Sequence, residues 1–264
     1  MSPRFSIVTV VLNPPVEEFL RTVASVLGQR EGNWELIIKD GGSDPACLAA
    51  IPSDPRIRVI TEKDSGIFDA MNQALDLVTG EFICFLNAGD WFYDSSALSH
   101  VATSVASASD ADFIYGDVAK PSSRSGFERY ADVLTRSYLF DRMICHQAWF
   151  VSSRYYARPE RYETELPTGA DRRFLLRMVL LNHVRSCHVP KVLVGYRGGG
   201  VSQKPENARR GRQWADQLRR EIYSPAEYRR LSLRTTLLRG LKRTVYDTVG
   251  WRIWRRMQAV RSGK

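Results

Sequence analysis

The sequence predicts an α/β fold with a mostly parallel central sheet, followed by basic C-terminal helices. Three observations carry this prediction. Short, continuous apolar runs rich in β-branched residues recur along the chain, and segments with helical spacing separate them over the first 118 residues. Strands of this kind are typical of parallel sheets that helices cover on both faces. Positive charge is concentrated after residue 228. The length of 264 residues suits one large domain or two small ones.

The elements of the first part follow from local patterns. We predict strands over 5–12, 34–38, 56–61, 81–86 and 113–118, because each is a short apolar run. We predict helices over 16–27, 67–78 and 97–105. In the first of these helices the apolar residues recur every three or four positions, and the second is closed by Gly80.

The second part is less regular. Residues 119–142 are polar and predict a long loop with strand pieces. A strand over 148–151, a helix over 172–181 and a strand over 189–194 follow, and the chain beyond Pro205 is expected to be helical. We therefore place one domain over 1–203, with halves of about 1–118 and 119–203, and a basic helical extension over 204–264.

The net charge of +9 belongs to this extension. From residue 228 onward there are eleven basic residues and one acid, interleaved with leucine and tryptophan. A basic helix with an apolar edge favours an anionic membrane surface. A helix packed on the domain is the plainer alternative. Nucleic acid is a third alternative and is disfavoured, because the chain lacks a recognition motif and its body is nearly neutral.

Other classes of protein are not indicated. The four cysteines are widely spaced and form no CxxC pattern, so we expect neither a zinc site nor a disulfide framework. The same spacing favours a reducing compartment. The N-terminus is too short and too β-branched for a signal peptide. No run reaches the ~18 apolar residues of a membrane-spanning helix.

Polar side chains follow the predicted strands where the strands end. Asn13 follows the first strand and Asp40, beside Gly41 and Gly42, follows the second. The others are Glu62, Asp64, Asn87, Asp90 and Asp117. Ligands bind at the carboxyl ends of strands in open parallel sheets. Several acids at one edge would repel one another, so we expect a hard divalent cation with phosphate ligands there.

At these residues the sequence resembles family 2 glycosyltransferases, above all bacterial members that build surface polysaccharides and glycolipids. The stretches SIVTVVLN, ELIIKDGGSD, EKDSGIFDAMNQALDLVTGEFICFLNAGDWF, CHQAWF, GADRRFLLRM and GGGVS occur in the family's order, over roughly residues 5–203. The resemblance implies a glycosyltransferase-A type fold, which is a single Rossmann-like domain. It also implies a nucleotide-linked sugar as donor, with UDP, GDP or dTDP as the nucleotide.

The resemblance implies roles for individual residues. Asp40 matches the acid that contacts the nucleoside, Asp64 and Asp69 match donor-site acids, and Asp171 matches the catalytic base of inverting members. Further residues expected at the donor site are Thr9, Asn13, Gly41, Asn72, Asn87, Asp90, Gly199, Gly200 and Ser202. His146, Gln147 and Trp91 are expected near the acceptor. Each has a structural alternative: an Asx turn, a helix cap, a flexible glycine segment or core packing.

Residues 87–90, Asn-Ala-Gly-Asp, fall where many members carry a metal-binding Asp-x-Asp pattern. With Asn87 and Gly89 in place of acids, Asp90 is the expected ligand of Mg²⁺ or Mn²⁺. Mg²⁺ takes only one or two protein carboxylates when phosphate oxygens complete its coordination. Such an ion would neutralise the charge that develops on the leaving diphosphate. The acceptor hydroxyl must lose its proton as it attacks, which is the role implied for Asp171.

The leading hypothesis is an inverting, metal-dependent glycosyltransferase at the inner face of the cytoplasmic membrane, acting on a lipid-linked glycan or glycolipid. A nucleotidyltransferase would need a glycine-rich basic loop after the first strand, which VTVVLNPPVEE lacks. A non-catalytic protein of the same fold would be expected to lose Asp90 or Asp171. A glycoside hydrolase needs paired carboxyl groups across the scissile bond, which would not explain acids at successive strand ends.

Overall fold

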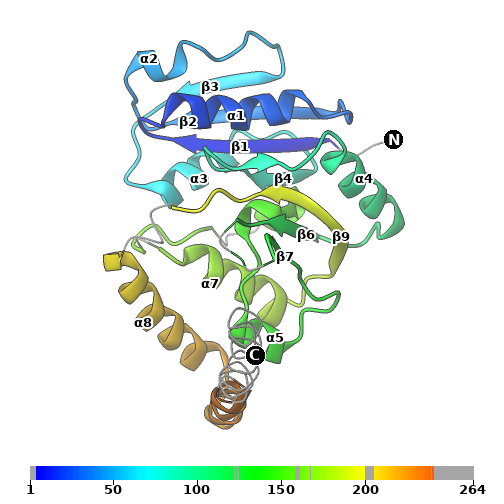
Figure 1. Ribbon diagram of the computed structural model, residues 1–264, viewed down its shortest axis with the longest axis vertical. Coiled ribbons are helices and arrows are strands. Elements are labelled where there is room, and N and C mark those ends of the chain that lie inside the picture. The colour runs from blue at the N-terminus through cyan, green and yellow to red at the C-terminus, as the bar shows by residue number, and fades with distance from the viewer. Residues whose placement is uncertain are drawn as a thin grey trace, which may run out of the picture. The chain divides into compact units, whose positions relative to one another are not determined.

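The computed structural model describes residues 4–121, 123, 125–157, 161–166, 168–199, 205–238 and 240 (Figure 1). Within these residues nine strands form one sheet, in which eight follow the order β3-β2-β1-β4-β8-β6-β9-β5 and β7 pairs with β6. The strands are β1 (Phe5–Val11), β2 (Trp34–Asp40), β3 (Ile57–Thr61), β4 (Phe82–Phe85), β5 (Trp91–Phe92), β6 (Phe113–Ala119), β7 (Phe127–Glu128), β8 (Trp149–Ser152) and β9 (Ser186–Gly195).

Helices connect and cover these strands. They are α1 (Val16–Leu27), α2 (Pro45–Leu48), α3 (Ile67–Leu75), α4 (Ala97–Ser107), α5 (Arg136–Asp141), α6 (Ser153–Tyr156), α7 (Ala170–Leu176) and α8 (Pro205–Ile222). A short 3₁₀ turn, η1 (His146–Ala148), precedes β8, and a π-helical turn, η2 (Arg177–Leu181), extends α7. The α/β fold class predicted from the sequence is confirmed.

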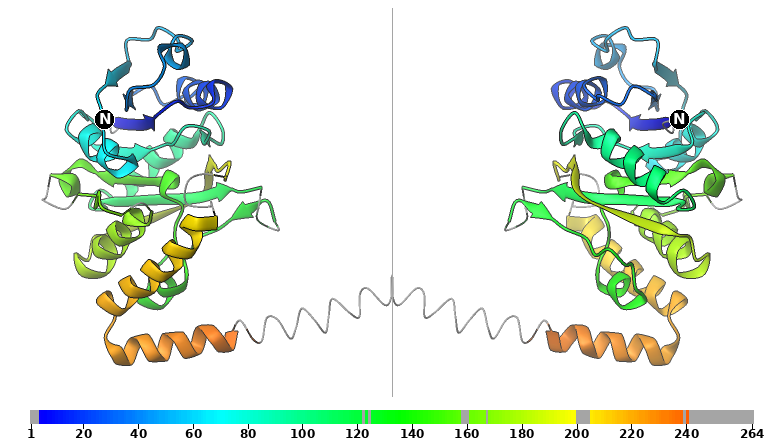
Figure 2. Two further views of the ribbon diagram at one scale, coloured as in Figure 1. Left: turned by 90° about the vertical axis from the view of Figure 1, so that its left-hand side faces the viewer. Right: turned by 90° about the vertical axis from the view of Figure 1, so that its right-hand side faces the viewer.

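The first four strands of the path β3-β2-β1-β4 are parallel. The chain moves outward from β1 to β3 and then returns across β2 and β1 to reach β4. Because both crossovers are right-handed, the outward helix α1 and the returning helix α3 must cover opposite faces. Figure 2 shows them on the two sides of β1. Because the four strands are parallel and adjacent, their carboxyl ends meet at one edge of the sheet.

The second half of the sheet is mixed rather than parallel. β6 and β9 are parallel, but β8 lies between β4 and β6 and is antiparallel to both. The direction of β8 follows from its entry point. The preceding turn η1 lies at the carboxyl edge, so the strand after it runs away from that edge. The consequence is that His146 and Gln147 are delivered to the edge where the parallel strands end.

The structure contains regular elements in a region where the sequence predicted mostly a loop. The predicted loop 119–142 contains β7 and α5, and the predicted helix over 172–181 begins two residues earlier, at Ala170. An aromatic cluster lies buried between β4, α6 and α7. Phe85 contacts Tyr156 and Tyr162 edge-on, and Tyr156 stacks on Phe174 with ring centroids 5.3 Å apart. This cluster joins the two halves of the sheet beneath the carboxyl edge.

The chain divides into two compact units, Met1–Ala215 and Asp216–Lys264, with the boundary inside α8. In the second unit residues 225–238 are helical. Leu233 and Leu237, one turn apart, expose about two thirds of their surface. The remainder of the predicted basic tail, from residue 241 on, lies outside the described residues. In the part of the chain that is described, no helix has both the length and the apolar character needed to cross a bilayer.

Candidate active site

The carboxyl edge of the parallel strands collects the acids predicted from the sequence. Asp40 ends β2, Asp64 follows β3, and Asp90 lies in the loop after β4. Their strands are neighbours in register, because β1 pairs with both β2 and β4 and β2 pairs with β3. The strand order thus brings Asp40 and Asp90, which are 50 positions apart in the sequence, to the same edge of the sheet.

Asp40 is fully buried at the end of β2. Burial alone would raise the pKa of its carboxyl group, but hydrogen bonds from the backbone N–H and hydroxyl of Ser43 hold that pKa below its usual value. Asn13, with a left-handed φ of 46°, adds a second tie to this loop: its backbone N–H donates to the Ser43 hydroxyl oxygen at 2.7 Å. The hydroxyl of Ser43 therefore ties the loop after β1 to the loop after β2.

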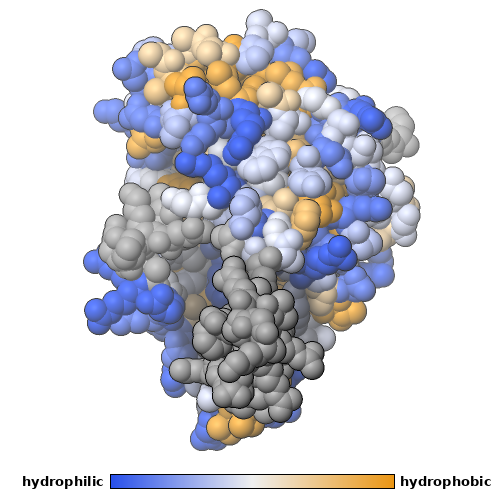
Figure 3. All heavy atoms as spheres, in the orientation of Figure 1, coloured by the Kyte–Doolittle hydropathy of each residue, from blue (hydrophilic) through white to orange (hydrophobic). Residues whose placement is uncertain are grey.

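A hollow of about 550 Å³ opens beside Asp40. Ser43 and Thr61 contribute polar groups, and Leu48, Ile51 and Val59 contribute apolar ones. Figure 3 shows apolar atoms gathered over the part of the molecule where α1, α2 and β3 lie; Val16 and Val59 are exposed there. A hollow with an apolar lining and a few polar groups at one end is suited to a flat, partly polar ligand.

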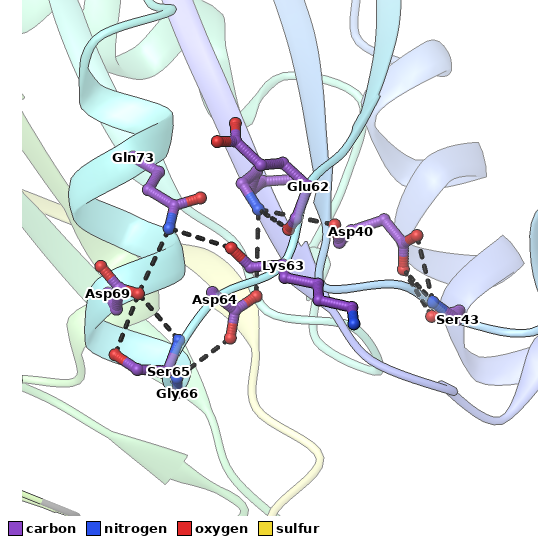
Figure 4. A network of polar contacts seen from close by, with 10 residues as sticks. Asp40, Ser43, Glu62, Lys63, Asp64, Ser65, Gly66, Asp69 and Gln73 are labelled. Atoms are coloured by element: carbon purple, nitrogen blue, oxygen red, sulfur yellow. Dashed lines mark hydrogen bonds and ion pairs between the residues drawn. The ribbon is translucent and has the colours of Figure 1, made fainter.

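Asp64, in the loop between β3 and α3, and Asp69, in the first turn of α3, belong to one network of polar contacts (Figure 4). The Asp64 carboxylate accepts a hydrogen bond from the N–H of Gly66 at 3.0 Å. The Asp69 carboxylate accepts from both the N–H and the hydroxyl of Ser65. The Ser65 N–H is the main cause of a lowered pKa at Asp69. Both acids therefore brace the loop between β3 and α3.

Asp90 is buried in the loop after β4, where it exposes 6% of its surface. Burial raises the pKa of its carboxyl group to about 7, although hydrogen bonds from the Arg197 N–H and the Gln147 side chain, together with the charges of Arg21 and Arg197, act in the other direction. Helix α1 anchors the loop: the Thr22 hydroxyl donates to the carbonyl oxygen of Asp90 and accepts from the N–H of Gly89.

Asp90 and Asp171 each interact with one residue of the dipeptide His146–Gln147. The Gln147 side chain hydrogen-bonds Asp90 on one side. The His146 ring shares a 2.8 Å hydrogen bond with the Tyr162 hydroxyl and stacks on Phe85. Burial lowers the pKa of His146 to about 4, while the charge of Asp171 acts to raise it. His146 is thus a buried, neutral imidazole within the field of Asp171.

Asp171 lies in the first turn of α7, which begins after Gly169 in a left-handed conformation (φ 91°). Its carboxylate accepts a 2.8 Å hydrogen bond from the N–H of Arg172 and is partly exposed. A Cβ on Gly169 would lie 2.8 Å from the ring of Trp214. Glycine at this position therefore permits both the turn and the close packing that orient the first turn of α7.

The loop 87–90 can hold a metal ion. The side-chain oxygen of Asn87 is buried and has no hydrogen-bond partner among the residues that the structure describes, and the Asp90 carboxylate lies three residues further on. Among the described residues no group of three or more His, Cys, Asp or Glu side chains could hold a metal. A divalent ion that takes one or two protein oxygens and completes its shell with phosphate oxygens fits this donor set. A metal site built entirely from protein ligands does not fit this donor set.

Several predicted donor-site residues have structural partners. The Thr9 hydroxyl donates to the carbonyl oxygen of Leu86 at 2.8 Å, which ties β1 to β4. Both polar atoms of the Asn72 side chain bond the backbone of Tyr162, at 2.8 and 3.0 Å. Gly41 lets the Asp64 carboxylate approach, because a Cβ there would lie 2.5 Å from it.

Trp91, one of the residues expected near the acceptor, has packing partners on α1 and β9. Its ring packs against the guanidinium of Arg21, 3.9 Å away, and over Gly195 of β9.

The remaining predicted residues lie elsewhere along the chain. Gly199 has a φ of 77°, which suits a turn. Gly200 and Ser202 lie outside the described residues. Asp117 is directed to His188, whose ring nitrogen lies 3.0 Å from its carboxylate, rather than to the acids of β2 and β4.

Two residues at the site were not predicted from the sequence. Arg197 binds Asp90 through its N–H and forms an ion pair with Glu18 of α1. Arg21 donates to the carbonyl oxygen of Gly89 at 2.6 Å. The one available signal for Arg197 was its position directly before three glycines. Arg21 lies on an ordinary amphipathic helix, so no local pattern could distinguish it.

Comparison with known proteins places this chain among glycosyltransferases. The model of the family described as glycosyl transferase family 2 matches residues 6–183. A PGL/p-HBAD biosynthesis glycosyltransferase of Mycobacterium tuberculosis is 33% identical over 182 residues, which cover 67% of this chain and 70% of the relative. An uncharacterized glycosyltransferase of the same species is 27% identical, over 68% of this chain and 70% of the relative.

Solved structures share the fold at low sequence identity. Staphylococcus aureus TarS 1–349 in complex with UDP-GlcNAc superposes with a TM-score of 0.64 and 14% identity, over 86% of this chain and 70% of that one. In a longer TarS structure the match covers 42% of that chain. The mannosyltransferase PcManGT from Pyrobaculum calidifontis, in complex with GDP-Man and Mn²⁺, gives 0.60 and 17%, over 81% and 61% of the two chains.

Proposed function

The chain belongs to glycosyl transferase family 2, and from that premise we propose that it transfers a sugar from a nucleotide-sugar donor to a hydroxyl group of a lipid-linked glycan or glycolipid, with inversion at the anomeric carbon. The fold is of the glycosyltransferase-A type. The observation that carries the proposal is the path Asp90–Gln147–His146–Asp171. In it Gln147 hydrogen-bonds Asp90 in the loop after β4, and His146 lies within the field of Asp171, a partly exposed acid in the first turn of α7.

The donor would lie along the carboxyl edge of β1 to β4. The hollow beside Asp40 has the apolar lining and polar end that suit a nucleoside base. Asp90 and Asn87 would hold Mg²⁺ or Mn²⁺, which neutralises the charge developing on the diphosphate leaving group. TarS was solved with UDP-GlcNAc and PcManGT with GDP-Man and Mn²⁺, which supports a donor and an ion of these classes.

Asp171 would act as the general base. Its carboxylate is partly exposed, and among the described residues one of its oxygens accepts a hydrogen bond from the N–H of Arg172. The second oxygen is then available to accept the proton of the acceptor hydroxyl as that oxygen attacks the anomeric carbon. Attack from the face opposite the diphosphate inverts the configuration. Arg172 supports this geometry by donating to the carbonyl oxygens of Leu139 and Phe140 in α5.

The test is a panel of UDP-, GDP- and dTDP-sugars offered with Mg²⁺ or Mn²⁺. Thermal melting and slow donor hydrolysis are both measured, because hydrolysis needs no acceptor. We expect at least one nucleotide sugar to raise the melting temperature and to be hydrolysed in a metal-dependent way. A panel in which no donor changes either quantity would contradict the proposal.

We further propose that the enzyme works at the cytoplasmic face of the membrane, held there by its basic tail. Arg229, Arg230 and Arg234 are exposed on the helical residues 225–238, and Leu233 and Leu237 are exposed beside them. This combination favours an anionic lipid surface. Deletion of residues 229–264 should release the protein from anionic vesicles in a flotation assay. Unchanged binding to the vesicles would refute the membrane proposal while leaving the donor panel unaffected.

A further inference from the structure

A lysine lies buried directly beneath the acids of the donor edge. Lys39 is the residue before Asp40 in β2, and its side chain has no exposed surface. Lysine is almost never fully buried unless it is paired, because removing an ammonium group from water is costly. Strand β2 is buried along its whole length, so Lys39 must find its partners inside the protein.

Three oxygens surround the Lys39 ammonium group. It donates to the carbonyl oxygen of Glu62, lies 3.5 Å from the carbonyl oxygen of Asp40, and lies 3.9 Å from a carboxylate oxygen of Asp64. The first and third oxygens belong to the loop between β3 and α3. Lys39 therefore fastens that loop to the end of β2, through one carbonyl group and one carboxylate.

The Asp64 side chain needs this partner. It exposes 9% of its surface, and the absence of a side chain at Gly41 lets it come close to the backbone of β2. The positive charge of Lys39 also contributes, after the Ser65 hydrogen bonds, to the lowered pKa of Asp69. One buried cation thus compensates an acid of the loop and an acid in the first turn of α3.

The neighbouring lysine does not share this position. Lys63 is exposed, and Figure 4 shows its side chain extending away from Asp69, on the far side of the loop from Ser65. A donor diphosphate would bring further negative charge to an edge that already carries Asp40, Asp64 and Asp69. A fixed positive charge under the loop lowers the repulsion between that diphosphate and the acids.

We propose that Lys39 is a positioning residue of the donor site: its buried ammonium group holds Asp64 and the loop 62–66 in the conformation that accepts the nucleotide sugar. This inference rests on the proposed function, in that it takes the carboxyl edge to be where the donor binds. Lys39 acts through Asp64 and makes no contact with the donor itself.

The test uses Lys39→Gln, Lys39→Met, Asp64→Asn and the double variant Lys39→Gln/Asp64→Asn, with the exposed Lys191→Met as a control for loss of one positive charge. Gln can still donate to the carbonyl oxygen of Glu62 but carries no charge, so it keeps the test valid if the Met variant does not fold. Donor KM and kcat for hydrolysis are measured beside the melting temperature.

We expect Lys39→Gln to raise donor KM by about tenfold, equivalent to roughly 1.4 kcal/mol, with kcat changed less than about twofold. Because Lys39 acts through Asp64, the same substitution should change KM by less than about twofold in the Asp64→Asn background. The Lys191→Met control should match the parent protein in both KM and melting temperature.

Two results would overturn the inference. One is a folded Lys39→Gln variant whose donor KM equals that of the parent protein. The other is an equal rise in KM with and without the Asp64 carboxylate, which would mean that Lys39 acts independently of Asp64. If instead the parent protein binds no nucleotide sugar at all, the proposed function itself fails, and the donor panel identifies that case before any variant is compared.

Discussion

The backbone N–H of Arg197 donates a 2.8 Å hydrogen bond to the buried carboxylate of Asp90. The two residues are 107 positions apart, and the bond joins the loop after β4 to the segment that follows β9. A second contact fastens the same segment to α1, where the Arg197 guanidinium pairs with Glu18. The loop proposed to hold metal is therefore enclosed by α1 on one side and by residues 196–199 on the other.

Asp90→Asn should separate metal binding from folding. Burial raises the pKa of Asp90 to about 7, so at pH 8 the folded protein holds an ionised carboxylate in an unfavourable environment. Asn is similar in size, keeps an oxygen for the Arg197 N–H and removes the charge. We expect the variant to melt no lower than the parent protein at pH 8 without metal, and to lose the rise in melting temperature that metal and donor produce together.

The matched control for this experiment is Asp94→Asn, an exposed acid four residues further on. It should retain the metal-dependent rise. If Asp90→Asn retained that rise as well, Asp90 would not be the metal ligand.

Gly41→Ala should weaken donor binding at little cost to stability. A Cβ at this position would lie 2.5 Å from a carboxylate oxygen of Asp64, and the end of that side chain can move aside. We expect the free energy of unfolding to change by less than about 1 kcal/mol while donor KM rises severalfold. Gly32→Ala is the control, because nothing lies within 4 Å of a Cβ there. Equal donor KM in the two variants would show that the position of Asp64 is unimportant.

The periodicity of the sequence predicts most elements of the fold because each pattern is local. Helix α1 has the predicted bounds, and β3 and β9 lie where apolar runs were found. The antiparallel insertion of β8 could not be predicted, since it depends on where η1 enters the sheet. The pairing of Trp91 with Gly195 could not be predicted either, because it joins β5 to a strand about a hundred residues later in the sequence.

Some residues of the candidate site could likewise be predicted from local sequence, and others could not. Acids at strand ends could be found from local sequence, and Asp40, Asp64 and Asp90 do meet at one edge. Lys39 could not be recognised, because in the sequence it is an ordinary residue of an apolar strand. Its burial depends on oxygens from a loop more than twenty residues away. Arg197 was missed for the same reason: its partners Asp90 and Glu18 are distant in the sequence.

His146 should make stability depend on pH. Burial lowers the pKa of its imidazole to about 4 in the folded state, against an ordinary value of 6.5. Between these values the unfolded state takes up a proton that the folded state does not, so the free energy of unfolding falls as the pH falls from 6.5 towards 4. The full loss amounts to roughly 3 kcal/mol.

His146→Phe tests this by urea unfolding at several pH values. Phenylalanine keeps a ring to stack on Phe85 but cannot be protonated. It loses the hydrogen bond to Tyr162, so the variant should be less stable than the parent protein at pH 7.5, and the difference between them should shrink as the pH falls towards 4. A difference that stays constant with pH would show that the pKa of His146 is the same in the folded and the unfolded protein, which would contradict the prediction.

Asp171→Asn should stop transfer while leaving donor binding intact. The residue lies on α7, away from the loops that carry Asp40, Asp64 and Asp90. Asn keeps an oxygen for the N–H of Arg172, so the first turn of the helix should be retained. Loss of a general base lowers a rate by about 10²–10⁴-fold, and we expect a decrease of this size in label transferred from the donor to a membrane lipid extract.

Glu165→Gln is the matched control, since Glu165 is an exposed acid in the segment that precedes α7. It should transfer sugar at the rate of the parent protein. Both variants should show the same donor-induced rise in melting temperature. If Asp171→Asn transferred sugar normally, the base would have to be sought elsewhere. If it lost donor binding together with transfer, Asp171 would belong to the donor site, and the separation between the two sides of His146–Gln147 would be wrong.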